Sequence, residues 1–183
     1  MSLEAQIQAL SDLGLKLNEG VTIDDLLYSW DRREYESEPF DTILFMFGSE
    51  VEREPWGRNV CDRAWNFDVE CVEGNGAYVT IVKRLALVAG AADSITDVKD
   101  AVSFETGEAW LSYKFNGEPR KYGIKIDNDW ADPEVVMAIM KDLERPGYRF
   151  YAKDNGQASI WFFLDDATAK KLNELSENAL QAN

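Results

Sequence analysis

The sequence predicts an α+β fold: a mainly antiparallel β-sheet of hairpins with amphipathic helices packed against it. Two stretches of alternating apolar residues each break at an Asn-Gly pair, and a stretch with helical spacing lies between them. Alternation indicates strands with one buried face, whereas the three- to four-residue period indicates a helix. Asn-Gly is typical of hairpin turns because both residues tolerate positive φ angles. We expect the helix to lie on one sheet that both hairpins build.

The two predicted hairpins account for four strands. The first pairs AWLSYKF (109–115) with RKYGIKI (120–126) across the break at 116–119. The second pairs YRFYAKD with QASIWFFL across Asn155-Gly156. Both breaks carry the turn chemistry of a tight connection between antiparallel strands.

The helix between the hairpins has start and stop signals. Asp132 is placed to cap its first turn, Pro133 suits the first helical position, and Pro146-Gly147 ends it. Its predicted buried face consists of Val135, Val136, Ile139, Met140 and Leu143.

The remaining elements follow from the same patterns. A first helix is expected from Leu3 to about Asn18, and a second begins at Thr22, with Asp25 completing a capping box. The apolar run TILFMFGSEVE, which contains Gly48, predicts a strand buried on both faces. The other predicted elements are a strand over 65–72, a helix over 78–89, a further strand in DAVSFETG, and a last helix capped by Asp165 or Asp166. The stretch VTIVKRLALV also fits a strand, although helical spacing is favoured.

Length and composition predict one domain over residues 1–183, with two as the upper bound. Within it, residues 1–35 form a helical segment, and the sheet and its helices occupy 41–180. The formal net charge is -15, from 34 acidic and 19 basic residues. This charge argues against nucleic acid as a partner, because phosphate binding needs clustered Lys and Arg. It favours a basic partner, or serves only solubility.

The start of the chain lacks the pattern of a secretory signal, and no apolar run is long enough for a membrane span. We therefore expect a cytoplasmic protein that does not enter a membrane. Cys61 and Cys71 are interpreted as free, partly buried thiols, since a chain of this size needs no disulfide. No cofactor is expected.

An enzyme would have to use carboxylates, because the chain contains no His. One candidate cluster is Asp127, Asp129, Asp132 and Glu134, whose oxygens suit Ca²⁺ or Mg²⁺. The spacing opens like a calcium loop, but no third acidic ligand, glycine turn or closing glutamate follows. Capping and a solvated acidic edge are therefore the preferred interpretation.

A second acidic cluster consists of Asp68, Glu70 and Glu73. It could supply a catalytic acid and base only if a cleft raised the pKa of one of these carboxyl groups. A carboxylate-dependent hydrolase or metal-binding enzyme is thus the first alternative function. The second is a structural subunit of a homo-oligomer joined through an edge strand. The sequence leaves the oligomeric state open.

A binding role accounts for more of the amino-acid composition than an enzymatic role does. The chain has six Trp and seven Tyr, which anchor interfaces when acidic neighbours steer a basic partner toward them. For any single aromatic residue, a half-buried place in the core is the competing interpretation. The first predicted contact surface is Asp127, Asp129, Trp130 and Asp132. The second is Trp30, Glu34, Tyr35 and Glu36.

Several phrases of the sequence resemble a known class of proteins. They are YSWDRREYESEPFDTILFMFGSEVE, WNFDVECVEGNGAYVTIVKRLALVAG, AWLSYKFNGEPRKYGIKIDNDWADPEVV and FYAKDNGQASIWFFL. Across residues 26–175 the chain is similar in these phrases to bacterial immunity proteins of polymorphic or contact-dependent toxin systems. The resemblance implies a small acidic cytoplasmic protein that binds a cognate toxin domain and occludes its active site. It implies no catalytic residue. For a nuclease toxin, the carboxylates would mimic the phosphates of its substrate.

Overall fold

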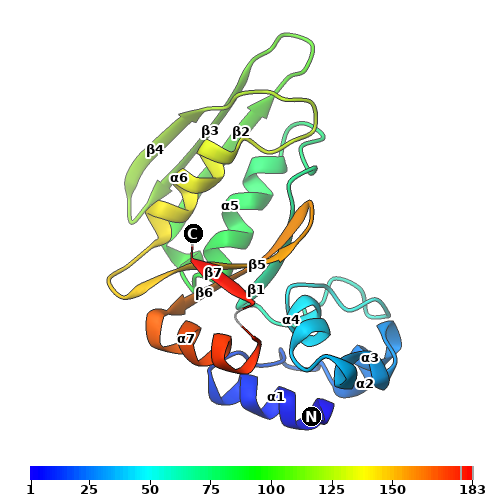
Figure 1. Ribbon diagram of the computed structural model, residues 1–183. Coiled ribbons are helices and arrows are strands. Elements are labelled where there is room, and N and C mark those ends of the chain that lie inside the picture. The colour runs from blue at the N-terminus through cyan, green and yellow to red at the C-terminus, as the bar shows by residue number, and fades with distance from the viewer. Residues whose placement is uncertain (178, 183) are drawn as a thin grey trace. The chain divides into compact units, whose positions relative to one another are not determined.

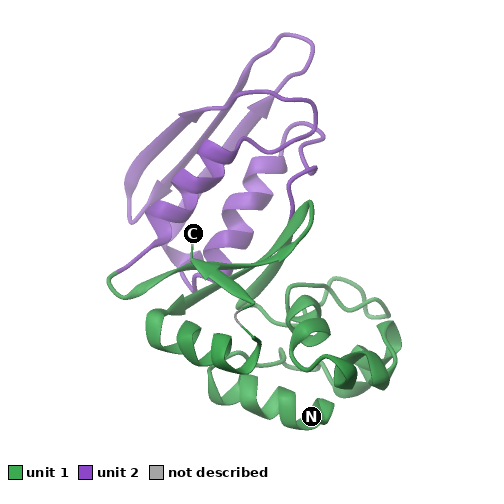
Figure 2. Cartoon of the chain, viewed as in Figure 1, with its two compact units in different colours: residues 1–67, 146–183 green, residues 68–145 purple. Residues whose placement is uncertain are grey.

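The computed structural model describes residues 1–177 and 179–182 and divides the chain into two compact units (Figures 1 and 2). Unit 1 comprises residues 1–67 and 146–183, and unit 2 comprises residues 68–145. The α+β fold is confirmed, because each unit combines helices with an antiparallel sheet. The expectation of one shared sheet is wrong, since the two predicted hairpins belong to different sheets.

Unit 1 contains a four-stranded sheet in the order β1-β6-β5-β7. Its core includes Leu10, Phe47 and Phe162, which are fully buried. The helices are α1 (Leu3–Asp12), α2 (Ile23–Ser29), α3 (Arg32–Ser37), α4 (Asp41–Phe47) and α7 (Asp166–Leu175). The strands are β1 (Ala64–Asp68), β5 (Tyr148–Asn155), β6 (Ala158–Asp165) and β7 (Leu180–Ala182).

Local capping explains where the helices of unit 1 begin. The Ser2 side chain accepts a hydrogen bond from the Ala5 N–H, and helix α1 then ends at Asp12, several residues before the predicted end. The predicted capping box is present at α2, because Thr22 and Asp25 satisfy each other's orphan N–H groups. Asp165 caps α7 as predicted.

The predicted buried strand in TILFMFGSEVE is wrong, because residues 41–47 form helix α4. Its buried residues are Ile43, Leu44, Met46 and Phe47, a spacing that places them on one helical face. A short apolar run does not distinguish a buried helix from a buried strand by periodicity. The run therefore has helical spacing, but this spacing does not by itself decide between a helix and a strand.

The second predicted hairpin is confirmed in the sheet of unit 1. Strands β5 and β6 pair from Tyr148 with Asp165 to Asn155 with Ala158. The turn lies one residue later than predicted, at 156–157, and Gly156 has a φ of 70°. One face of the hairpin carries an aromatic cluster in which Phe150 lies 4.9 Å from Phe163 and 6.5 Å from Trp161 between ring centroids.

Unit 2 contains a three-stranded sheet in the order β2-β3-β4, with two helices on the same face (Figure 1). The helices are α5 (Ala77–Val88) and α6 (Pro133–Leu143), and a short 3₁₀ helix, η1 (Ala92–Ser94), follows α5. The strands are β2 (Ile95–Val102), β3 (Ala109–Phe115) and β4 (Glu118–Gly123).

The first predicted hairpin and both predicted helices of unit 2 are confirmed. Strands β3 and β4 join at Asn116-Gly117, whose φ angles of 50° and 82° suit a tight turn. The turn is shorter than the predicted break at 116–119, and β4 covers Glu118–Gly123 rather than 120–126. Helix α6 begins at Pro133 after its Asp132 cap, as the sequence predicts. Asp100 of β2 caps α5 from outside, because its carboxylate accepts hydrogen bonds from the N–H groups of Gly76, Tyr78 and Val79 at 2.7, 2.9 and 3.2 Å.

Asp142 ties α6 to the β3-β4 hairpin. Its carboxylate accepts hydrogen bonds from the hydroxyls of Tyr113 and Tyr122 at 2.8 and 2.9 Å, and from Nε of Arg120 at 3.1 Å. Burial, followed by the hydrogen bond with Asp142, raises the pKa of Tyr113 above its usual range. One carboxylate therefore satisfies three donors on the helix-facing side of the sheet.

Replacing Asp142 with asparagine is expected to lower the free energy of unfolding by about 2 kcal/mol, because hydrogen bonds to a charged acceptor are lost. Urea unfolding followed by circular dichroism measures the change. Glu118→Gln, at an exposed position of β4, removes the same charge and serves as the control. Equal stability of the two variants would show that the Asp142 contacts do not hold α6 on the sheet.

Two smaller predictions concern the thiols and the membrane. Cys61 and Cys71 are both free, as predicted, and burial raises the pKa of each to about 11. Among the described residues, no helix combines the length and apolar character needed to cross a bilayer.

Candidate functional site

Two segments of unit 2 that are far apart in sequence form a backbone ribbon at the surface. The Val72 N–H donates to the Asp129 carbonyl at 2.9 Å, and the Ala131 N–H donates to the Val69 carbonyl at 2.8 Å. Glu70 and Trp130 are antiparallel partners in this ribbon. Residues paired in this way have neighbouring side chains. The ribbon therefore joins segment 69–72 to segment 127–131.

The ribbon carries several exposed side chains, which we call the Trp130 patch: Glu70, Glu73, Asp127, Asp129 and Trp130. Trp130 is 44% exposed although it is a large apolar residue. Within the described part of the chain, no Lys or Arg forms an ion pair with any of its four carboxylates. One carboxylate from each of the two predicted acidic clusters, Glu70 and Asp127, is thus a backbone partner of the exposed Trp130.

The backbone fixes the turn that presents Trp130. The Trp130 N–H donates to the Asp127 carbonyl at 3.0 Å, and Asn128 between them adopts a φ of 50°. Asparagine is among the residues that tolerate this left-handed conformation. A backbone hydrogen bond therefore closes the turn that carries the exposed carboxylates and the indole.

Asp132, which the sequence placed in the contact surface, supports the turn from beneath. It is only 8% exposed, and its carboxylate accepts hydrogen bonds from the N–H groups of Lys125 at 2.7 Å and Glu134 at 3.0 Å. Its own N–H donates to the Tyr78 hydroxyl at 2.7 Å. Both carboxylate oxygens of Asp132 therefore accept hydrogen bonds from backbone N–H groups. The predicted contact surface is corrected to exclude Asp132.

This use of Asp132 also bears on the metal site considered from the sequence. Among residues 1–177 and 179–182, no group of three or more Cys, Asp or Glu side chains is arranged to hold a metal ion. In the second acidic cluster, Asp68 accepts a hydrogen bond from the Glu70 N–H at 2.9 Å, an arrangement typical of a local turn.

The second predicted contact surface is only partly at the surface. Tyr35 is fully buried, and its hydroxyl donates to the Leu26 carbonyl at 2.8 Å. Glu36 accepts from the Leu3 N–H at 3.1 Å and pairs with Arg32 at 3.3 Å. Tyr35 is corrected to a structural role, because it is buried and its hydroxyl bonds to the backbone. The Glu36 side chain stays 34% exposed and remains part of the predicted surface. Glu34 and Trp30 remain exposed, Trp30 to 43%.

Trp30 borders a small pocket that the sequence did not predict. The pocket has a volume of about 250 Å³ and includes Phe45 and Lys153 in its lining. Lys153 is only 13% exposed, and its ammonium pairs with Asp41 at 2.8 Å. Trp30 therefore lines a pocket in which the charge of Lys153 is already neutralised by Asp41.

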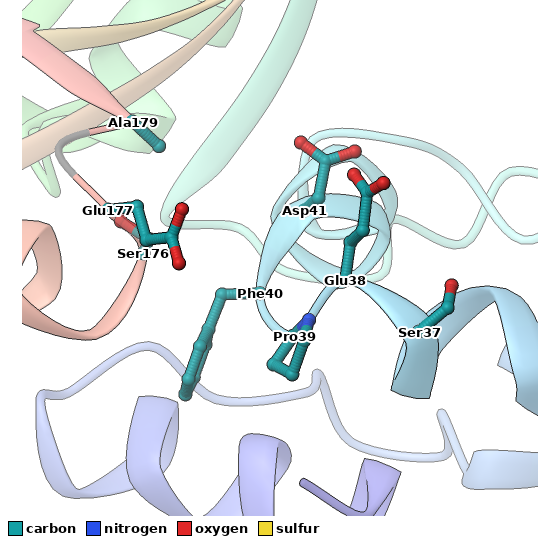
Figure 3. A pocket seen from close by; sticks show the side chains of 8 residues that line it. All are labelled: Ser37, Glu38, Pro39, Phe40, Asp41, Ser176, Glu177 and Ala179. Carbon is teal, nitrogen blue, oxygen red and sulfur yellow. The ribbon is translucent and has the colours of Figure 1, made fainter.

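A larger pocket of about 490 Å³ lies between the start of α4 and the segment after α7 (Figure 3). Glu38 and Asp41 line one side and Glu177 the other, and the buried Phe40 lies between them. These residues are dispersed in the sequence, so no local motif marks the pocket. Its carboxylates favour a cationic group over an anionic one.

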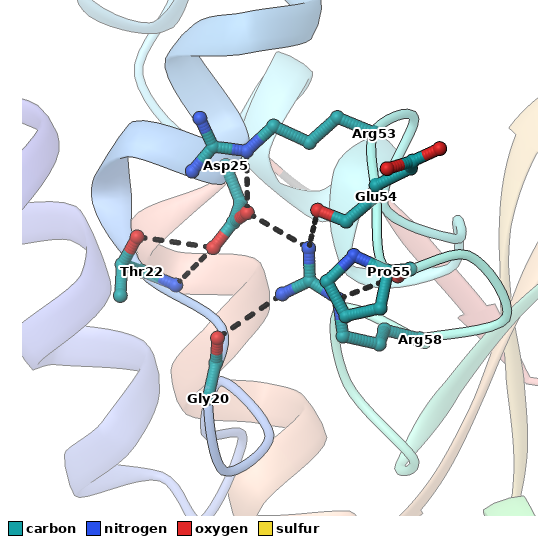
Figure 4. Close-up of polar contacts among 7 residues, drawn as sticks. All are labelled: Gly20, Thr22, Asp25, Arg53, Glu54, Pro55 and Arg58. Atoms are coloured by element: carbon teal, nitrogen blue, oxygen red, sulfur yellow. Dashed lines mark hydrogen bonds and ion pairs between the residues drawn. The ribbon is translucent and has the colours of Figure 1, made fainter.

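An ion-pair network around the buried Asp25 in unit 1 holds the loop that bears Trp56 (Figure 4). Asp25 accepts hydrogen bonds from Arg53 at 2.8 Å and from Arg58 at 3.1 Å. Arg58 also donates to the Pro55 carbonyl at 2.8 Å. The loop is thus anchored on both sides of Trp56, which is 68% exposed. The sequence predicted the Asp25 cap but not its two arginine partners.

Comparisons with protein-family models, with curated proteins and with solved structures found no match to this chain. The Trp130 patch combines an exposed aromatic side chain, a backbone fixed by hydrogen bonds and four carboxylates that have no ion-pair partner among the residues the structure describes.

Proposed function

We propose that this chain is an acidic binding protein that neutralises a cognate bacterial toxin by binding it and occluding its active site. The single observation that carries the proposal is the Trp130 patch, where two separate segments bring carboxylates beside an exposed indole. The net charge of -15 and the resemblance of the sequence to immunity proteins support the same function. The protein would act in the cytoplasm, where the toxin would reach its target.

The chemistry of the patch suits a basic partner. Exposed carboxylates attract Lys and Arg side chains and accelerate association, while a large aromatic residue supplies most of the affinity once it is desolvated. A lysine or arginine over the Trp130 ring would add a cation–π contact. If the toxin is a nuclease, Glu70, Asp127 and Asp129 would occupy positions that its substrate phosphates take.

The Trp130→Ala variant is expected to bind the toxin more weakly by about 2 kcal/mol or more, because the anchor at the centre of the patch is removed. Isothermal titration against the purified toxin domain gives the dissociation constant. Trp56→Ala is the matched control, since Trp56 is also exposed but belongs to unit 1. An unchanged dissociation constant in a folded Trp130→Ala variant would remove Trp130 from the interface.

The carboxylates are tested through the association rate with the toxin domain, measured by stopped-flow fluorescence at several salt concentrations. The triple variant Glu70→Gln, Asp127→Asn and Asp129→Asn should associate more slowly and lose most of the salt dependence of the wild type. Exposed charges are screened over about 8 Å at physiological ionic strength, so steering must weaken as salt rises. A wild-type association rate that does not change with salt would contradict steering by the patch.

A further inference from the structure

The sheet of unit 2 has one face that the helices leave open. Leu111 and Tyr113 of β3 point to the helix side, where both are buried and Tyr113 reaches Asp142. Because side chains alternate along a strand, the intervening residues of β3 lie on the open face. They are Trp110, Ser112 and Lys114.

The strand register identifies the other side chains of the open face. Ser112 pairs with Lys99 of β2 on one side and with Lys121 of β4 on the other. The three residues therefore form a row across the sheet, with the two lysine Cα atoms about 10 Å apart. Lys114 follows two residues along β3, so three lysines share this face.

These lysines differ in how they are neutralised. Lys114 pairs with Asp97 at 2.8 Å, and Asp97 lies at an irregularity of β2 with a φ of 53°. Lys99 and Lys121 are exposed, and neither forms an ion pair within the described residues. In a chain with 34 acidic residues, the regular positions of this face carry no carboxylate.

Trp110 lies next to the lysine row and has small neighbours on both adjacent strands. It pairs with Ala101 of β2 and with Gly123 of β4. Neither neighbour has a side chain large enough to cover an indole, and the space where a Gly123 Cβ would lie is open. Trp110 is partly buried, so an apolar or aromatic side chain of a partner would contact the part of its indole that stays exposed beside the two lysines.

We propose that the open face of the β2-β3-β4 sheet binds a carboxylate-bearing protein segment, with Lys99 and Lys121 pairing its carboxylates and Trp110 contacting its apolar side chain. The face is separate from the Trp130 patch, so this proposal goes beyond the proposed function. Charge complementarity selects an anionic partner. A protein segment is favoured over nucleic acid, because three lysines offer few phosphate contacts and the net charge of -15 repels a polyanion.

The test uses the full chain and a fluorescein-labelled peptide in which Glu and Phe alternate, followed by fluorescence anisotropy. We expect saturable binding that weakens about tenfold in the Lys99→Glu, Lys121→Glu double variant, since two exposed attractions become repulsions. Trp110→Ala should weaken it as well. Lys83→Glu, Lys125→Glu is the control with the same change of net charge, because both lysines are exposed outside this sheet.

Each other outcome overturns the proposal. Absence of saturable binding to the wild type contradicts it directly. Equal loss in the control double variant shows that only net charge matters. A labelled oligothymidylate is the third comparison. If it binds more tightly than the peptide and the Lys99→Glu, Lys121→Glu variant loses this binding, the partner of the face is single-stranded nucleic acid and not a protein segment. Circular dichroism of each variant verifies folding before its affinity is compared.

Discussion

Replacing Asp25 with asparagine is expected to lower the free energy of unfolding by about 3 kcal/mol. Asp25 is 3% exposed, and its carboxylate is the common acceptor for Arg53, Arg58 and the Thr22 N–H (Figure 4). Arg53 and Arg58 are 37% and 21% exposed, so the loss comes mainly from weaker hydrogen bonds at the buried Asp25 position, where a charged acceptor becomes a neutral amide. Urea unfolding followed by tryptophan fluorescence measures the change.

The same residue makes stability depend on pH. Burial raises the pKa of Asp25, but hydrogen bonds from Thr22, Arg53 and Arg58 outweigh it and hold the pKa well below the usual range. A carboxylate whose pKa is lower in the folded state stabilises the fold above its unfolded pKa, about 4, and this contribution is lost as pH falls. The difference between wild type and Asp25→Asn should therefore shrink below about pH 4.

Asp24 provides the control, because it is exposed in the same turn of α2. Asp24→Asn removes the same charge from the same helix terminus without touching either arginine, so it should change stability by less than about 1 kcal/mol. If Asp24→Asn and Asp25→Asn are equally destabilising, the effect belongs to the helix dipole and the ion-pair network contributes nothing measurable.

Replacing Gly48 with alanine is expected to lower the free energy of unfolding by about 2 to 3 kcal/mol. A Cβ at Gly48 would lie 2.6 Å from the Asn66 nitrogen and 3.0 Å from the Trp65 carbonyl carbon. Both are backbone atoms of β1, so neither moves without displacing the strand. The Gly48 carbonyl also accepts a hydrogen bond from the Asn66 N–H at 2.8 Å, which fixes the close approach.

The control for Gly48 is another glycine with a negative φ. Gly123→Ala introduces the same methyl group where no heavy atom lies within 4 Å, and its φ is not in the left-handed region. It should be neutral or slightly stabilising, because alanine restricts the unfolded chain. Equal stability of Gly48→Ala and wild type in urea would show that the end of α4 does not need this contact with β1.

Local signals in the sequence predicted several elements correctly, and long-range pairing decided the rest. Caps and turns identified α2, α6, α7 and the two hairpins, because these features depend on neighbouring residues. Which strands share a sheet depends on partners far along the chain, such as β7 beside β5. That pairing has no local signature. The two hairpins consequently were assigned to one sheet when they belong to two.

Strand β2 shows a second reason for failure. The register shifts between Thr96 and Lys99, so the apolar alternation that identifies a strand is interrupted within ITDVKDAV. The spacing there predicts a connection followed by a short strand. The lysine row on the open face depends on this irregular register and was not predictable from spacing.

The candidate site was predicted in part. Exposure of Asp127, Asp129 and Trp130 agrees with the first predicted surface, but their proximity to Glu70 depends on backbone bonds between 69–72 and 127–131. Tyr35 illustrates the opposite error. A tyrosine within a charged segment suggests exposure, yet its hydroxyl finds a backbone acceptor in the core. Composition does not distinguish these two outcomes.

The most direct test of the proposed function is affinity capture with two baits from a lysate of the organism that encodes the chain, followed by mass spectrometry. One bait is the wild type, and the other carries Asp129→Lys and Trp130→Ala. We predict that the wild type recovers a basic toxin domain in near equal amount, that the variant does not, and that added wild type suppresses the toxin's activity. A captured domain that both baits retain equally, or whose activity the wild type leaves unchanged, would contradict the proposal.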